Sequence, residues 1–133
     1  MSLDSIANSC FVCGPSNSNG LKVRFSIRDD VCLGVFTPSE DHVGYDNVTH
    51  GGIIFSLLDD VMANWLWLHD EQCFTAKADI RYYQKLPIGI EVRLEGRCNQ
   101  RKGRLAKMSG EAVRTDNGET IAVAFGSFMV PTA

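Results

Sequence analysis

The chain has 133 residues, of which 44% are hydrophobic and 22% are charged. This is the composition of one ordinary globular domain, and it excludes a disordered or collagen-like chain. The net charge of −3 argues against a general nucleic-acid binder, which would carry a basic face. No apolar run approaches the roughly 18 residues that cross a bilayer, so no membrane span is expected.

The cysteines and the first residues bear on the cellular compartment. The five cysteines are an odd number, which does not suit a framework of disulfides. Residues 1–5 contain neither the positive charge nor the apolar run of a secretory signal. We therefore expect a cytoplasmic protein with reduced thiols.

Hydrophobic periodicity predicts the secondary structure in chain order. Residues 1–20 are rich in turn formers and are expected to be irregular. Residues 50–68 form the one long apolar stretch of helical character, with Thr49 as the expected N-cap. Asp29-Asp30 and Asp116-Asn-Gly118 are expected hairpin turns. Alternation of apolar and polar residues predicts strands at 21–29, 31–37, 73–84, 88–98, 104–115 and 119–130.

These elements define the fold class. One long helix with six strands, mostly antiparallel, predicts a single α+β domain over residues 1–133, with the sheet wrapped around a central helix. An all-parallel sheet would need more crossover helices than the chain provides. Because the helix is apolar over most of its circumference, we expect it to be buried.

The predicted helix begins with two glycines, Gly51 and Gly52. Each glycine costs about 1 kcal/mol relative to alanine within a helix. In return, a substrate oxygen can approach the unpaired N–H groups of the first turn, which lie at the positive end of the helix dipole. This arrangement suits an oxyanion hole. Close packing of a loop against the helix is the alternative explanation.

Two adjacent carboxylates, Asp59 and Asp60, interrupt the apolar run of the same helix. Burial would raise the pKa of such a carboxylate and improve it as a base near neutral pH. Adjacent helical positions point about 100° apart, so we expect the two residues to have different roles. Asp59 shares a face with small residues and is the candidate catalytic group. For Asp60 a buried ion pair or a capping role is favoured over substrate binding.

The spacing of these groups predicts the assembly. Gly52 and Asp59 are seven residues apart, which is about 10 Å along a helix axis. A general base and an oxyanion donor must both act within about 3 Å of one carbonyl group. If both residues act, they therefore come from two chains, which predicts an obligate homodimer with two composite sites.

Residues 48–60, which contain His50-Gly51-Gly52 and an acid nine positions after the histidine, resemble the helix motif of hotdog-fold acyl-CoA thioesterases, in particular the PaaI-like branch. Residues 10–21, 42–45 and 75–82 are similar to other stretches of that branch. The resemblance covers nearly the whole chain in the right order.

The resemblance implies a hotdog fold and hydrolysis of an acyl thioester of coenzyme A or of an acyl carrier protein, with no cofactor. It also implies a homodimer, or a tetramer built as a dimer of dimers. Asp59 matches the catalytic carboxylate, acting as base or as nucleophile, and Gly52 matches the backbone donor to the thioester carbonyl. His50 matches a positioning histidine. Thr75 matches a hydroxyl that helps to orient water from the partner chain.

Two weaker signals remain. Cys10 and Cys13 have the spacing of a metal-binding pair, but structural zinc takes four ligands and no second pair is present, so no metal site is expected. The cluster of Arg101, Lys102 and Arg104 can hold the phosphates of coenzyme A, although a solvated turn is the commoner role.

Two other functions compete with hydrolysis. One is an acyl-thioester dehydratase or hydratase, which would pair a histidine such as His42 with a carboxylic acid. The other is a non-catalytic module that binds acyl-CoA.

Overall fold

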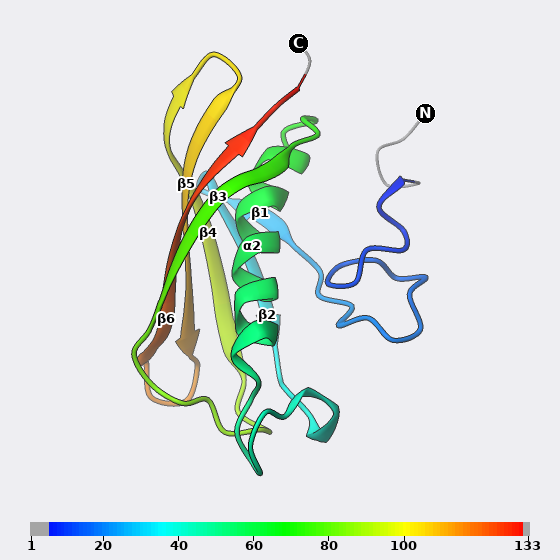
Figure 1. Ribbon diagram of the computed structural model, residues 1–133, viewed down its shortest axis with the longest axis vertical. Helices are drawn as coiled ribbons and strands as arrows, with labels where there is room; N and C mark the ends of the chain where they lie inside the picture. The colour runs from blue at the N-terminus through cyan, green and yellow to red at the C-terminus, as the bar shows by residue number, and fades with distance from the viewer. Residues whose placement is uncertain (1–5, 132–133) are drawn as a thin grey trace.

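The computed structural model describes residues 6–131 and contains one long helix on one face of a sheet (Figure 1). Helix α2 spans Gly51–Trp67, and a short 3-10 helix, η1, spans Glu40–His42. The six strands are β1 (Ser26–Arg28), β2 (Val31–Phe36), β3 (Phe74–Tyr82), β4 (Val92–Lys102), β5 (Leu105–Arg114) and β6 (Thr120–Met129). Residues 1–5, on which the expectation about a secretory signal depends, lie outside the described range.

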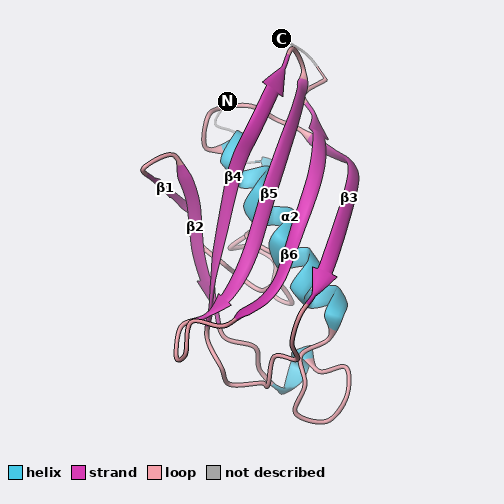
Figure 2. Cartoon of the chain, turned by 90° about the vertical axis from the view of Figure 1, so that its left-hand side faces the viewer, coloured by secondary structure: helices cyan, strands magenta, loops and turns pink. Residues whose placement is uncertain are grey.

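The sheet has the strand order β1-β2-β4-β5-β6-β3, and every pair of neighbours is antiparallel. Figure 2 shows β1 and β3 at opposite edges of this sheet, with α2 behind it. The prediction of an α+β hotdog fold is confirmed. The helix described here is not long and apolar enough to cross a membrane.

The helix packs closely on the middle of the sheet. Gly96 of β4 and Gly110 of β5 face each other in the register. A Cβ at Gly96 would lie 2.5 Å from the carbonyl oxygen of Val61, so only a residue without a side chain fits there. The buried residues of α2 are Ile54, Leu57, Leu58, Val61, Met62, Asn64 and Leu66. The rest of the helix is partly buried, except for the exposed Gly51 and Gly52 at its start.

The sequence placed the first strand at 21–29, but β1 covers three residues only. Lys22 has φ 57°, which is incompatible with a strand. The N–H groups of Leu21 and Val23 donate to the carbonyl oxygens of Phe11 and Val12. The apolar alternation therefore reflects packing within the N-terminal segment, residues 6–25, rather than a place in the sheet.

Two further boundaries differ from the predictions. The strand expected at 88–98 begins at Val92, because Gly89 turns the chain with φ 84°. The N-cap of α2 is His50 and not Thr49. The N–H of Thr49 instead donates to the carbonyl oxygen of Leu86, and its buried hydroxyl has no hydrogen-bond partner within the described residues.

The N-terminal segment lies on the side of α2 that faces away from the sheet (Figure 1). Val12 and Val23 are buried and belong to the same hydrophobic core as the helix and the sheet. The helix is therefore held between two layers, and its two carboxylates meet different neighbours.

Candidate active site

The start of α2 is capped by His50. The N–H of Gly52 donates to His50 Nδ1 at 2.8 Å, so this nitrogen is the unprotonated one of the ring. A Cβ at Gly52 would lie 3.0 Å from the same nitrogen, so glycine leaves room for the imidazole. The backbone donor predicted to polarise a substrate carbonyl is thus occupied by a side chain of its own chain.

A side chain of the sheet contacts the backbone of Gly51. The Tyr82 hydroxyl, on β3, donates to the carbonyl oxygen of Gly51 at 2.7 Å. Burial raises the pKa of Tyr82 above its ordinary value, so the hydroxyl stays a donor at neutral pH. Both glycines at the helix start are exposed, but the Gly52 N–H and the Gly51 carbonyl oxygen already have partners within the chain.

A hollow of about 330 Å³ borders this end of the helix. His42 lies in its wall together with His50 and Gly52. His42 Nδ1 accepts the N–H of Ser39 at 2.9 Å, which caps η1. The sequence suggested His42 only as the base of a competing function, and the serine three residues before it was the signal for this capping contact.

Asp59 lies two turns further along α2 and contacts β3. The Thr75 hydroxyl donates to Asp59 Oδ1 at 2.6 Å within the same chain. Asp59 is partly buried and Thr75 is exposed. A carboxylate can accept several hydrogen bonds, so Asp59 keeps acceptor capacity for a water molecule while the threonine fixes its orientation.

Asp60 faces the N-terminal segment instead. The Cys10 thiol approaches Asp60 Oδ1 at 3.8 Å, and Asn64 Nδ2 donates to Asp60 Oδ2 at 3.0 Å. Burial raises the pKa of Asp60, and the charge of Asp59 adds to this effect, while hydrogen bonds from Cys13, Cys10 and Asn64 oppose it. Burial, together with the charge of Asp60, also raises the pKa of Cys13. The sequence counted Asp60 among substrate-binding candidates, but its contacts are with protein.

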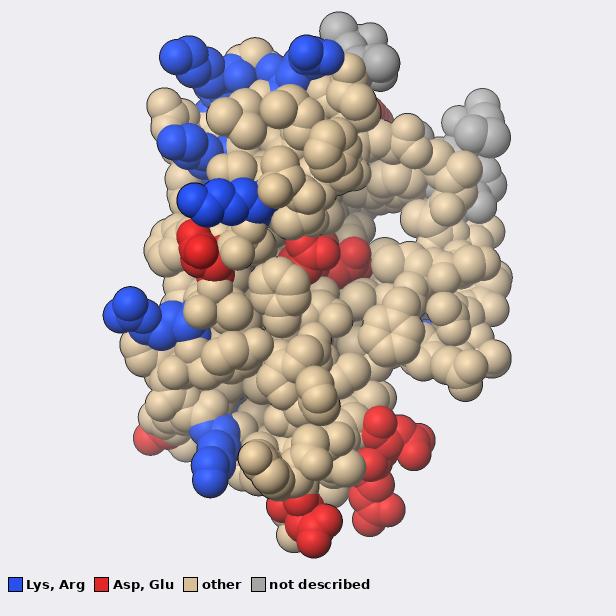
Figure 3. All heavy atoms as spheres, in the orientation of Figure 1, with Lys and Arg blue, Asp and Glu red and all other residues tan. Residues whose placement is uncertain are grey.

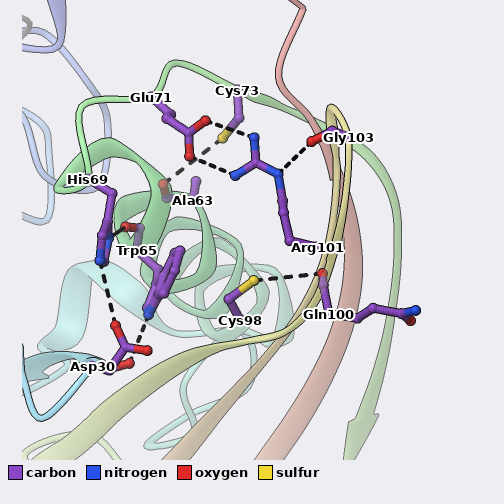
Figure 4. A network of polar contacts seen from close by, with 10 residues as sticks. All are labelled: Asp30, Ala63, Trp65, His69, Glu71, Cys73, Cys98, Gln100, Arg101 and Gly103. Atoms are coloured by element: carbon purple, nitrogen blue, oxygen red, sulfur yellow. Dashed lines mark hydrogen bonds and ion pairs between the residues drawn. The ribbon is translucent and has the colours of Figure 1, made fainter. Parts of the chain in front are cut away.

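The basic cluster lies at the β4–β5 hairpin, at the opposite end of α2 from the two glycines (Figure 1). The helix has 17 residues, so these groups are about 25 Å apart along the axis. Figure 4 shows that Arg101 points toward Glu71 and binds both of its carboxylate oxygens at 2.7 Å. This hydrogen bonding lowers the pKa of Glu71. Arg104 donates to the carbonyl oxygen of Pro131.

Lys102 is exposed at the same hairpin. On the face drawn in Figure 3, most basic atoms lie toward this end of the molecule, and acidic atoms lie at the middle and at the opposite end. Within one chain, the structure therefore brings Asp59 and Thr75 together and brings His50, Gly51 and Gly52 together. It places the hairpin of Arg101, Lys102 and Arg104 at the other end of α2 from the glycines.

Sequence reasoning missed the contacts of Asp60 with Cys10, Cys13 and Asn64. Fifty residues separate Cys10 from Asp60, and no local pattern predicts such a contact. Asn64 was the available signal, because it is a polar residue one helical turn after Asp60 in an apolar run.

The thioesterase superfamily model matches residues 46–121, which is more than half of the chain. The protein belongs to that superfamily, as the helix motif indicated. No curated protein matches the chain.

Similar solved structures support the fold. A thioesterase superfamily protein is 25% identical, with a TM-score of 0.81 over 89% of this chain and 61% of the other. The PaaI protein of the phenylacetic acid degradation operon of E. coli is 16% identical, with a TM-score of 0.78 over 85% and 82%. A hypothetical thioesterase of Streptococcus pneumoniae, crystallised with coenzyme A, is 16% identical, with a TM-score of 0.76 over 82% and 88%.

Proposed function

We propose that this protein hydrolyses acyl-CoA thioesters, with Asp59 as the carboxylate that drives the attack of water. The observation that carries the proposal is the short hydrogen bond from Thr75 to Asp59. It holds one oxygen of a partly buried carboxylate on a helix that belongs to a thioesterase domain.

The chemistry needs a base and a polarised carbonyl. Asp59 accepts a proton from water as the water oxygen bonds to the carbonyl carbon. The bond from that carbon to sulfur then breaks, and the leaving thiolate of coenzyme A takes up the proton that Asp59 accepted, which returns Asp59 to the carboxylate. A backbone N–H at the start of α2 would stabilise the charge on the carbonyl oxygen. If the Gly52 N–H fills this role, the carbonyl must share or replace the His50 ring as its acceptor.

One helix cannot supply both groups to the same carbonyl, because Gly52 and Asp59 are about 10 Å apart along its axis. We therefore propose that the helix start comes from a second copy of the chain. Strand β3 supports this assembly because it is an edge of the sheet. It also exposes Phe74 and Tyr82, which are 54% and 46% accessible. An edge strand with exposed aromatic residues is suited to pairing with another chain.

The pneumococcal thioesterase supports coenzyme A as the carrier. That protein was crystallised with coenzyme A, and two further structures of it are alanine mutants, one of an aspartate and one of a threonine 16 positions later. Asp59 and Thr75 are also separated by 16 positions. The proposal extends this pairing of residues to the present chain.

We propose that the basic hairpin of a neighbouring subunit contacts the phosphates of coenzyme A. Lys102 supports this role because it is exposed. The Arg101 guanidinium already pairs with Glu71, so it could bind phosphate only by exchanging that carboxylate for the phosphate.

A reducing cytoplasm remains the predicted location.

The test is thiol release from short, long and aryl acyl-CoA by the wild type, Asp59→Asn and the charge-matched control Asp29→Asn, which changes an exposed acid at the turn between β1 and β2. A positioned base contributes about 10²–10⁴ in rate. We therefore expect Asp59→Asn to lower kcat at least about 100-fold and Asp29→Asn to stay near the wild type.

The competing functions give different results in the same assay. A binding module would bind acyl-CoA saturably and release no thiol in the wild type or in Asp59→Asn. A hydratase or dehydratase would require His42, so His42→Ala would abolish turnover of an enoyl-CoA or hydroxyacyl-CoA while the protein stays folded. Equal thiol release by the wild type and Asp59→Asn would show that Asp59 is structural.

A further inference from the structure

The side of α2 that faces the N-terminal segment carries a cluster of three potential metal ligands. One ligand atom from each of Cys10, Cys13 and Asp60 lies within 4.8 Å of the others. The measured separation of Cys10 Sγ and Asp60 Oδ1 is 3.8 Å. Tetrahedral zinc, with bonds of about 2.3 Å to sulfur and about 2.0–2.2 Å to oxygen, places its ligand atoms about 3.5–3.8 Å apart. The cluster is therefore close to the size that zinc requires.

The local backbone also suits a metal-bound thiolate. The N–H of Cys13 is directed at Cys10 Sγ at 3.5 Å, and the N–H of Gly14 closes the turn on the carbonyl oxygen of Cys10 at 2.9 Å. A Cβ at Gly14 would overlap the backbone of Asn8 and Cys10, so glycine permits this tight turn. The turn therefore holds the two cysteines close together on one side of the segment.

The cluster lacks a positive partner. Within residues 6–131, no lysine, arginine or histidine forms an ion pair with Asp60. Asn64 Nδ2 donates to Asp60 Oδ2 and approaches Cys13 Sγ at 3.8 Å, so one amide orients two of the three groups. Asp60 is a partly buried carboxylate without a cation, which carries an electrostatic cost, and a divalent ion would supply the missing charge.

We propose that Cys10, Cys13 and Asp60 bind a zinc ion, which fastens the N-terminal segment to α2. A hollow of about 170 Å³ borders all three residues and leaves the fourth position to water. Binding releases the two thiol protons to solvent, and no group is oxidised or reduced. The expectation of no metal site counted only the two cysteines. The structure adds Asp60 as a third protein ligand, and the proposed site takes water as its fourth ligand.

The segment that the ion would fasten has little regular structure of its own. Between Ala7 and Arg24 the chain forms turns and irregular structure, held by Val12 and Val23 in the core and by a few backbone hydrogen bonds. A metal that joins Cys10 and Cys13 to a helix 50 residues away closes a long loop, which stabilises the folded state.

The experiment measures metal content and thiolate coordination directly. Wild-type protein is purified under reducing conditions, stripped with a chelator and titrated with zinc against a colorimetric chelator. It is then loaded with cobalt, whose thiolate complexes give a charge-transfer absorption. We expect about one zinc per chain and the cobalt–thiolate band. Cys13→Ser and Asp60→Asn are expected to lose at least about tenfold in affinity, since even outer partners of a metal contribute 10–100-fold.

The matched control is Cys98→Ser, which removes a partly buried cysteine on β4 outside the cluster. It should bind zinc as the wild type does. Stripped wild-type protein should also lose its N-terminal segment to limited proteolysis faster than the zinc-loaded protein. Two outcomes would overturn the proposal. One is wild-type zinc and cobalt binding no stronger than that of Cys13→Ser, and the other is a Cys10–Cys13 disulfide in protein purified separately without reductant, seen by mass spectrometry.

Discussion

The two neighbouring carboxylates of α2 have opposite surroundings. Asp59 contacts the hydroxyl of Thr75 on an edge strand of the sheet, the strand at which we propose that a second chain pairs. Asp60 is covered by the N-terminal segment, where two thiols and Asn64 surround it, and burial raises its pKa. A rotation of about 100° between adjacent residues is enough to place one carboxylate on an open side and the other on a covered side.

The roles of Asp59 and Asp60 therefore cannot be inferred from the presence of two adjacent acids in the sequence. Two acids in an apolar helix depart from the usual pattern, and such departures often mark function. Here the departure has two separate explanations, one for each side of the helix. Changes on the open side should therefore act on turnover, and changes on the covered side should act on stability.

The largest effect on stability is expected on the covered side, from Asn64→Ala. This substitution removes an N–H donor from Asp60 and leaves a partly buried acceptor without it, which costs about 1–3 kcal/mol of unfolding free energy. Urea denaturation of the stripped protein measures the loss, and acyl-CoA turnover should stay near the wild type. Asn19→Ala, at an exposed loop position, is the control. A large loss of kcat with unchanged stability would contradict the division between the two sides.

On the open side, Thr75→Val should lower kcat about tenfold with little change in KM. Valine keeps the shape of threonine but cannot donate to Asp59. A hydrogen bond to a charged group contributes about 1.5–3 kcal/mol, and tenfold in rate corresponds to about 1.4 kcal/mol. Thr75→Ser retains the hydroxyl and should recover most of the rate. If valine and serine behave alike in steady-state kinetics, the hydroxyl has no part in the reaction.

The fold was largely accessible from the sequence because its signals are local. The helix predicted at 50–68 is Gly51–Trp67, and the turn residues Asp29-Asp30 and Asp116–Gly118 join the strand pairs that they predicted. The prediction of the first strand was wrong because alternation of apolar residues indicates burial on one side. It does not indicate which element packs against that side.

The candidate site was also predictable only where its geometry is local. The geometry of a helix is enough to predict that Gly52 and Asp59 lie far apart along its axis and that Asp59 and Asp60 point in different directions. The contact of Thr75 with Asp59 depends on how β3 lies against α2, so only the family resemblance suggested that position. The approach of Cys10 and Cys13 to Asp60 joins parts of the chain about 50 residues apart, and neither periodicity nor the motif contains that information.

The smallest effect tests whether the two sides of α2 separate cleanly. His50 lies at the open start of the helix, yet its ring caps the Gly52 N–H, so His50→Ala should cost about 1 kcal/mol of stability, as lost caps do. His50→Asn offers a shorter acceptor and should recover part of this in urea denaturation. An unchanged midpoint in His50→Ala would mean that water satisfies the freed N–H. If stability falls while kcat rises, the His50 ring competes with the substrate carbonyl for the Gly52 N–H. The hydrogen bond that stabilises the start of the helix would then be one that slows the reaction.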